Sequence, residues 1–324
     1  MGRRGPRRRR RARRPRRCAA RVRLRPVGTG VPAHQRATPV RARHDDAGPR
    51  RGLRRVPEGD TLWRVANRLS PALVGRRVTA LRLAPPALAS EARRHRVEGS
   101  TIVAVEARGK HLLVRFSTGV ALHTHLGMTG SWHLYRAGSR WRSPAHLARV
   151  VLEADGVVAV CFVPRVVELV PEKDEGAHPT LAALGPDVVA DGFDAFAAVA
   201  RLQARGPLPI GAALLDQTAL SGIGNIYKSE VLFLCGTDPF APVASLDAER
   251  LREIVDIAHE QMRRRVLAPI VPTTDGGGRA PYWVYGRARR PCRRCATLIR
   301  AARQGRPSRT TYWCPRCQPS RPSG

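Results

Sequence analysis

The stretch RRVPEGDTLWR, residues 54–64, lies where the sequence changes character. The 55 residues that precede Val56 contain 21 arginines against two acidic residues, and they have almost no hydrophobic periodicity. From Leu62 to Leu73 apolar residues recur at the spacing of one helix face, which predicts a helix. A folded domain is therefore expected to begin at Pro57, directly after a valine.

The arginine-rich segment, residues 1–56, is predicted to be a disordered extension, because one dominant charge and few apolar residues cannot offset the entropy of folding. Organelle transit peptides are also rich in arginine and poor in acids, but residues 1–55 contain no serine, which argues against that interpretation. The amino acids of this segment have GC-rich codons, so we interpret it as translated DNA upstream of the true start. We expect it to be absent from the mature protein.

Residues 57–178 are predicted to form an α+β domain with one leading helix and a mainly antiparallel sandwich or barrel. Asp60 is a candidate N-cap of the helix and Gly75 is its candidate stop. A hairpin turn is expected at residues 117–119, and Asp155-Gly156 is typical of a type I′ turn. The expected strands are residues 78–83, 101–107, 111–116, 119–126 and 166–170, with a further hairpin over residues 148–163.

Residues 179–270 are predicted to form a helical domain, because Gly-Pro and Ser-Gly punctuation separates segments of helical periodicity. Residues 271–318 return to turns, aromatic residues and cysteines, and residues 319–324 form a tail. The expected helices are residues 193–204, 211–219, 225–235 and 247–267.

The net charge of +33 favours a polyanionic partner, and nucleic acid is the usual one. The alternative is a basic surface that serves solubility alone. No run of 18 apolar residues exists, so no membrane span is predicted. Seven cysteines do not form an even disulfide framework, and a reducing cytosol fits them better than secretion.

Four cysteines have the spacing of a zinc site. Two Cys-x2-Cys pairs are separated by 18 residues, and each pair directs two thiolates at one point. Because four protein ligands leave no open position, we expect a structural Zn²⁺ that holds a short hairpin, with two disulfides or chance as the alternatives. The arginines around the pairs suit phosphate binding. The predicted ligands are Cys292, Cys295, Cys314 and Cys317.

The segment SGIGNIYKSE, residues 221–230, places two glycines before an asparagine and a predicted helix. Glycines permit a tight turn, and a helix start offers unpaired N–H groups to an anion. Asn225 either binds a phosphate oxygen or caps its own helix, and the residues alone favour the cap.

Three separated motifs together resemble the formamidopyrimidine-DNA glycosylase / endonuclease VIII family of base-excision repair enzymes. They are PEGDTLWR, GIGNIYKSE and YGRARRPCRRC…SRTTYWCPRCQ, in that order within residues 57–318. The resemblance implies a β-sandwich with an N-terminal helix, then a helix–two-turns–helix domain with a zinc-finger hairpin. It also implies a monomeric, cytoplasmic bacterial enzyme whose partner is damaged DNA.

The resemblance gives roles to Pro57 and Glu58. In this family the mature enzyme begins with a proline whose free amine attacks C1′ of the damaged nucleotide, expels the base and forms a Schiff base. The glutamate that follows protonates the opening sugar. A proline inside a chain is a tertiary amide without a usable lone pair. We therefore expect translation to begin at Val56, read from a GTG codon as methionine, whose removal exposes Pro57; proteolytic trimming is the alternative.

The resemblance assigns further residues around the DNA. Lys110 matches a strand lysine that touches phosphate near the lesion, Asn225 a phosphate-binding asparagine, and Arg309 a zinc-finger arginine on the flanking phosphates. Met128 resembles the side chain that fills the vacated stack, the alternative being a core methionine. The implied catalytic set is Pro57, Glu58, Lys110 and Arg309, and the implied DNA-binding set is Lys110, Met128, Asn225 and Arg309.

The chain also departs from part of this family. The 8-oxoguanine enzymes carry an Arg-Phe-Gly trio, whereas the corresponding region here reads VCFVPRVVELV, residues 160–170. The PEGD opening resembles the endonuclease VIII branch, which favours oxidised pyrimidines. The implied function is a glycosylase with abasic-site lyase activity that acts by β,δ-elimination. The alternatives are a catalytically inactive DNA-binding protein of the same fold, if the N-terminus stays blocked, and a basic RNA-binding protein.

Overall fold

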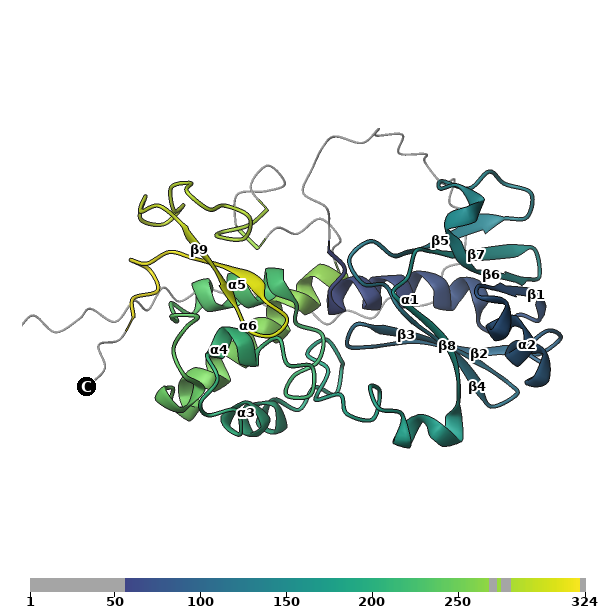
Figure 1. The fold of residues 1–324 in the computed structure, drawn as a ribbon, viewed down its shortest axis with the longest axis horizontal. Helices are drawn as coiled ribbons and strands as arrows, with labels where there is room; N and C mark the ends of the chain where they lie inside the picture. Colours follow the sequence, from purple (N-terminus) through teal and green to yellow (C-terminus); the bar gives the residue numbers. More distant parts are fainter. Residues whose placement is uncertain (1–55, 268–272, 275–280, 321–324) are drawn as a thin grey trace, which may run out of the picture. The chain divides into compact units, whose positions relative to one another are not determined.

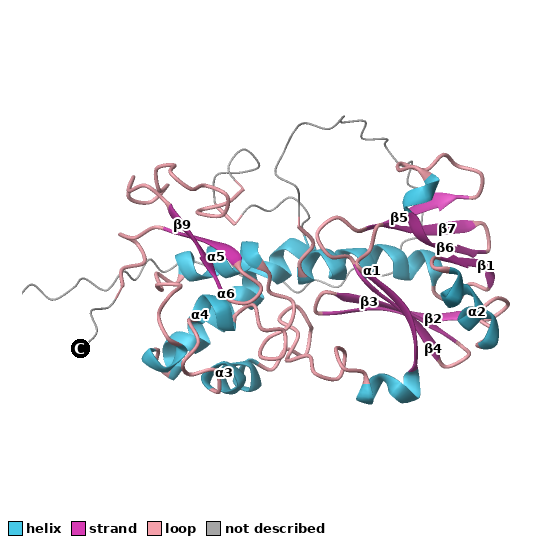
Figure 2. Cartoon of the chain, viewed as in Figure 1, coloured by secondary structure: helices cyan, strands magenta, loops and turns pink. Residues whose placement is uncertain are grey.

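The computed structural model describes residues 56–267, 273–274 and 281–320 (Figure 1). The N-terminal extension, which is predicted to be disordered, lies outside the described residues except for Val56, and so does the end of the C-terminal tail. Two four-stranded sheets, a group of helices and a two-stranded hairpin make up the fold (Figure 2). The expected α+β architecture is confirmed.

The chain enters the fold through helix α1 (Gly59–Leu73), which packs on β2 and α6. Asp60 is not its N-cap: that position belongs to Glu58, whose carbonyl accepts from Thr61 N at 2.9 Å, and Asp60 lies in the first turn. The helix ends before Gly75, which has φ +83° as expected of a stop. Its buried apolar face consists of Leu62, Ala66, Leu69 and Leu73.

Two antiparallel four-stranded sheets form the predicted β-sandwich, and apolar residues from both sheets and α1 share one core. The 117–119 turn and the Asp155-Gly156 turn are both present, the second with positive φ at both residues. One sheet contains, in spatial order, β1 (Val78–Leu83), β6 (Ala148–Ala154), β7 (Val157–Phe162) and β5 (Ser131–Arg136). The other contains β2 (Ile102–Arg108), β3 (His111–Phe116), β4 (Val120–His125) and β8 (Val166–Pro171).

Several short elements were not predicted. Strand β5 and helix α2 (Pro86–Arg94) were missed; α2 is short, and Ala92 is its one fully buried residue. The described part of the chain also contains three short 3₁₀ segments: η1 (Ala145–Leu147), η2 (Glu172–Ala177) and η3 (Val243–Ser245).

The helical part follows the prediction in three of four segments. These are α3 (Ala195–Gln203), α5 (Asn225–Leu234) and α6 (Ala248–Leu267). The predicted helix over residues 211–219 is too long, because α4 (Ile210–Ala213) gives way to a turn that the Asp216 side chain stabilises by accepting from Thr218 N. The helices enclose a second apolar core.

The C-terminal hairpin pairs β9 (Arg300–Gln304) with β10 (Arg309–Trp313), and β10 packs against α5. Figure 1 shows this hairpin beside the helices. Within the described ranges, no helix combines the length and the apolarity that crossing a bilayer requires.

Candidate active site and metal centre

Glu58 contacts the N-terminus of α5, although the two are far apart in sequence. Its carboxylate oxygens accept hydrogen bonds from the backbone N–H groups of Gly224, Ile226 and Tyr227, at 3.0, 2.7 and 3.3 Å. The residue is only 1% exposed. This helix start was predicted to bind an anion, and in the free protein the anion is a carboxylate of the same chain.

Three glycines allow this contact. Gly59 N donates to Gly222 O at 2.9 Å, and a β carbon on Gly59 would lie 2.8 Å from Gly222 Cα. A β carbon on Gly224 would lie 2.3 Å from Cδ of Glu58. Gly222 itself has φ +100°, which a residue with a side chain rarely adopts. The PEGD and GIGN motifs are therefore two halves of one close packing contact.

The surroundings of Glu58 shift its proton equilibrium. Burial raises the pKa of Glu58 to about 7, although Lys110 and the amides of Ile226 and Tyr227 oppose the shift. Burial likewise lowers the pKa of Lys110 to about 8, with Glu58 opposing. Near neutral pH, Glu58 can therefore carry a proton and give it up, as a general acid must.

Lys110 lies in the two-residue turn between β2 and β3. Its Nζ donates to Ile223 O at 2.5 Å, so it reaches the glycine turn that holds Glu58. The neighbouring Gly109 N donates to Asp187 Oδ2 at 2.8 Å, and Trp63 Nε1 donates to the same oxygen at 3.0 Å. Sequence reasoning missed Asp187, because no motif surrounds it.

Asn225 connects α5 to the hairpin. Gly224 occupies the N-cap position and Asn225 is the first helical residue, so the cap interpretation of Asn225 is wrong. Glu58 already satisfies the N–H groups that a cap would serve. The Asn225 side-chain amide donates instead to Thr310 O of β10 at 2.8 Å.

Lys228 is a second lysine near this site, and sequence reasoning did not select it. It is 0% exposed, and its Nζ donates to Thr311 Oγ1 at 2.7 Å. Burial lowers its pKa to about 8, and Glu58 opposes the shift. The only available signal was its rarity, because the chain contains three lysines.

Arg309 and Met128 lie in contact at the hairpin, with Nη1 of Arg309 3.8 Å from Sδ of Met128. Met128 is 55% exposed, so its interpretation as a core methionine is wrong. The contact brings the loop after β4 to the first residue of β10. An exposed thioether beside a guanidinium can meet a base and a phosphate.

Pro57 directly precedes Glu58 and is partly buried. In the 324-residue chain, its nitrogen forms the amide bond to Val56. The predicted residues thus fall into two linked groups. Pro57, Glu58 and Lys110 surround the glycine turn, and Met128 and Arg309 meet at the hairpin. Asn225 joins the groups, because it follows Gly224 and bonds to the residue after Arg309.

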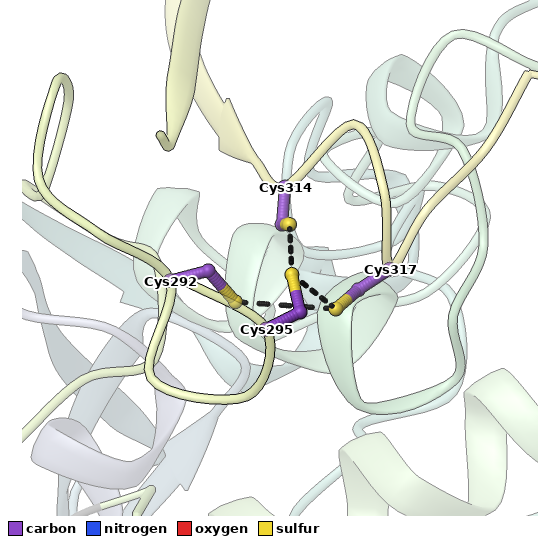
Figure 3. A group of neighbouring side chains, drawn as sticks. All are labelled: Cys292, Cys295, Cys314 and Cys317. Atoms are coloured by element: carbon purple, nitrogen blue, oxygen red, sulfur yellow. Dashed lines mark hydrogen bonds between the residues drawn. The ribbon is translucent and has the colours of Figure 1, made fainter. Parts of the chain in front are cut away.

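The four cysteines converge as predicted and are placed to bind one metal ion (Figure 3). Their sulfur atoms all lie within 4.8 Å of one another, with Sγ–Sγ distances of 3.9 Å for Cys292–Cys317 and 3.4 Å for both Cys295–Cys314 and Cys295–Cys317. Thiolates about 2.3 Å from a tetrahedral zinc ion would be spaced similarly. None of the four forms a disulfide, so the disulfide alternative is wrong.

The fold and site together define a two-part α+β protein that presents a carboxyl of raised pKa, two lysines of lowered pKa and an arginine-rich hairpin with four cysteines placed to bind a metal ion. Residues 56–165 match the model of the formamidopyrimidine-DNA glycosylase N-terminal domain, and residues 184–271 match that of the formamidopyrimidine-DNA glycosylase H2TH domain. The chain belongs to the formamidopyrimidine-DNA glycosylase / endonuclease VIII family.

Named relatives lie in both branches of the family. A probable endonuclease 8 2 of Streptomyces coelicolor is 41% identical over 266 residues, which cover 81% of this chain and 94% of the relative. A DNA-(apurinic or apyrimidinic site) lyase Nei2 of Mycolicibacterium smegmatis is 35% identical, covering 81% and 99%. Among solved structures, the MutM (Fpg) protein of Thermus thermophilus superposes with a TM-score of 0.69 at 29% identity, covering 82% of this chain and all of that one.

Proposed function

We propose that the protein is a base-excision DNA glycosylase with abasic-site lyase activity, and that Pro57, as a free N-terminal amine, is its nucleophile. The observation that carries the proposal is the buried Glu58, whose pKa is raised to about 7 and which directly follows Pro57. Family membership supports it, and so does the lyase name of the Mycolicibacterium relative.

In the proposed reaction, the lone pair of the Pro57 nitrogen forms a bond to C1′ while the bond from C1′ to the base breaks. The N–H proton of the attacking amine passes to the departing base, so the base leaves neutral. Glu58 gives its proton to the ring oxygen, so the sugar opens and leaves an iminium ion, the Schiff base of a secondary amine, with no proton on its nitrogen. Loss of a proton from C2′ then expels the 3′ phosphate, and a second elimination expels the 5′ phosphate. Water finally releases the sugar remnant and restores the amine.

The N-terminus must be free for this reaction. The family match begins at Val56, directly before Pro57, and 81% of this chain accounts for 99% of the Mycolicibacterium relative. Both observations support a mature protein that starts at Pro57. If residues 1–56 stay attached, the same fold would bind damaged DNA without cleaving it.

Lys110, Asn225 and Arg309 are proposed to bind the DNA phosphates, and Met128 is proposed to fill the gap left by an extruded nucleotide. The contact of Asn225 with Thr310 supports this, because it places an amide next to Arg309. The metal is proposed to be a structural Zn²⁺ on the four cysteines. It would fix the hairpin that carries Arg309 and take no part in the chemistry.

Oxidised pyrimidines are the proposed substrate class. Four of the named relatives at 35–41% identity carry endonuclease 8 or Nei2 names, whereas those named formamidopyrimidine-DNA glycosylase are 31–33% identical. The absence of an Arg-Phe-Gly trio within residues 160–170 points in the same direction.

The test is product analysis with protein that begins at Pro57. Duplexes carrying one 5-hydroxyuracil or one 8-oxoguanine opposite cytosine are incubated, and the released base and strand ends are identified. We expect free 5-hydroxyuracil, a nick with phosphate at both ends, and slower release of 8-oxoguanine. Release of neither base, with an intact strand, would contradict the proposal.

A further inference from the structure

The second sheet carries a cluster of ionisable side chains that the proposed chemistry does not use. His111 and His123 lie on adjacent strands β3 and β4, and Glu168 on β8 pairs with His123 in register. The chain then leaves β8 as a linker, residues 172–187, which brings His178 to the same place. We call His111, His123, Glu168 and His178 the histidine network.

The network is continuously hydrogen bonded. His178 Nε2 and His123 Nδ1 lie 3.0 and 2.6 Å from the same Glu168 oxygen, Oε1. His123 Nε2 lies 2.7 Å from His111 Nδ1. His123 is 1% exposed, so these contacts are protected from water on the sheet side.

The backbone fixes the direction of these bonds. The N–H groups of Thr180 and Leu181 both point at His178 Nδ1, at 3.2 and 3.1 Å, so this nitrogen is an acceptor. In a neutral imidazole the proton then sits on Nε2, which donates to Glu168. His123 Nδ1 also donates to Glu168, so its Nε2 accepts from His111 Nδ1.

His123, Glu168 and His178 also have the composition of a metal site, and their ligand atoms lie within 4.8 Å of one another. The bonding of His178 argues against this interpretation. Its Nε2 could bind a metal only after losing its proton, while Nδ1 still accepts two backbone N–H groups. That would require an imidazolate, or loss of both backbone bonds.

The linker is fastened at further points and ends at the site. Glu175 bonds to Arg115 of β3 and to Arg108 of β2, and Leu181 is buried against Leu113 and Ala121. At the end of the linker, Asp187 accepts from Gly109 N, next to Lys110. At the other end of the network, His111 directly follows Lys110 in the chain.

We propose that the histidine network is a latch that docks the linker onto the sheet and so holds the Gly109–Lys110 turn from both sides. Glu168 and His178 are then positioning residues for Lys110, and this role rests on the proposed function. When the latch opens, Trp63 and Ser221 still hold Asp187, but the Gly109–Lys110 turn loses its support from the His111 side and the lysine loses its alignment with the glycine turn.

The three lysines allow a direct measurement of latch opening. Lys173 lies exposed on η2 within the linker, whereas Lys228 is fully buried and Lys110 is partly buried in its turn. A lysine-specific endoproteinase acting on the folded full chain should therefore cut first after Lys173, and only when the linker detaches. Cutting at all three lysines would instead report global unfolding.

Glu168→Gln should raise the rate of cutting after Lys173 by about tenfold or more, because it removes the charged acceptor that two histidines share. The matched control is Glu153→Gln, which removes a carboxylate bonded to Arg82 on the other sheet. The protease should cut this variant at the wild-type rate. If Glu168→Gln unfolds the chain, His178→Ala provides the same test. A wild-type rate in a folded latch variant would overturn the proposal, as would a second bound metal ion that Glu168→Gln removes.

A second readout separates positioning from stability. Glu168→Gln should lower the single-turnover rate on an abasic-site duplex by about tenfold at saturating DNA, while its affinity for undamaged duplex stays at the wild-type value. If a variant is cut faster after Lys173 but its single-turnover rate on the abasic-site duplex is unchanged, the positioning role is refuted. A wild-type protein without lyase activity would refute the proposed function instead, and the protease result would still decide the latch.

Discussion

The Glu58 carboxylate accepts a hydrogen bond from Gly224 N at 3.0 Å, and it occupies the space where a β carbon on residue 224 would lie. Gly224→Ala should therefore displace Glu58, lowering stability by about 1–3 kcal/mol and activity by about a hundredfold. Gly192→Ala is the control, because a β carbon there meets no atom within 4 Å. Thermal melting and strand nicking by protein starting at Pro57 check this. Equal activity of the two variants would show that Glu58 placement is unimportant.

The pH dependence should be bell-shaped. Glu58 must be protonated to act as an acid, so its contribution is lost as pH rises through about 7. The free proline amine, with a pKa near 8, must be unprotonated, so its contribution is lost as pH falls below about 8. We expect an optimum near pH ~7.5, measured as single-turnover rates between pH 5.5 and 9.5. Glu58→Gln should abolish the alkaline limb; a wild-type profile in that variant would assign the limb to another group.

Stability should decline in acid through the histidines of the second sheet. Burial lowers the pKa of His111 to about 3 and of His125 to about 4. In the unfolded chain these side chains titrate near 6.5, so the unfolded state binds more protons below that pH. These two histidines therefore cost no stability above pH ~6.5, and the free energy of unfolding decreases progressively as the pH falls toward ~4. Urea unfolding at pH 7 and pH 5 measures this, and His111→Gln should reduce the difference.

Arg309 should contribute affinity without sequence preference. Arg309→Ala removes a guanidinium beside Met128 on the hairpin and should lower the salt-dependence slope of binding to abasic duplex by about one. The control is Arg82→Ala on β1. It removes an arginine that pairs with Glu153 of β6, and it should leave the slope unchanged. Fluorescence anisotropy across a range of salt concentrations gives both slopes. Equal slopes for the two variants would place Arg309 away from the phosphates.

Metal removal should unfold the hairpin and leave the sandwich folded. Cys314→Ser deletes one of four converging thiols, so zinc content should fall from about one ion per chain to near zero, with weaker DNA binding. Cys161→Ala, in the sandwich core far along the chain from the four ligands, should keep its zinc. Elemental analysis and binding assays on both variants measure this. Unchanged zinc and affinity in Cys314→Ser would remove the metal claim.

The elements that could be predicted from the sequence are those that depend on residues close together in the chain. Helix α1, the two turns of the sandwich and the paired cysteines all follow from periodicity, turn residues or spacing. The sequence did not predict contacts between distant segments. The helix start after the glycine turn was expected to offer its N–H groups to an anion, yet no local pattern indicates that this anion is the Glu58 carboxylate.

Most of the remaining misses have the same origin. The Asn225 cap was wrong because Glu58, distant in sequence, bonds to the start of α5. The Asp60 cap was wrong for a local reason, because α1 begins at Gly59 and Glu58 is its N-cap. Asp187, Lys228 and the histidine network depend on packing between strands, a linker and the hairpin. Met128 could not be separated from a core methionine, because exposure depends on the loop around it.

The central claim is that Pro57 is a nucleophile only when its nitrogen is free. Borohydride trapping on an abasic-site duplex tests this most directly, because it reduces a Schiff base to a stable covalent adduct. Protein beginning at Pro57 and the full 324-residue chain, shown by mass to be intact, are compared side by side. We expect an adduct only with the Pro57 form, mapped by peptide mass to Pro57. An equal adduct with the intact chain, or none with either form, would contradict the claim.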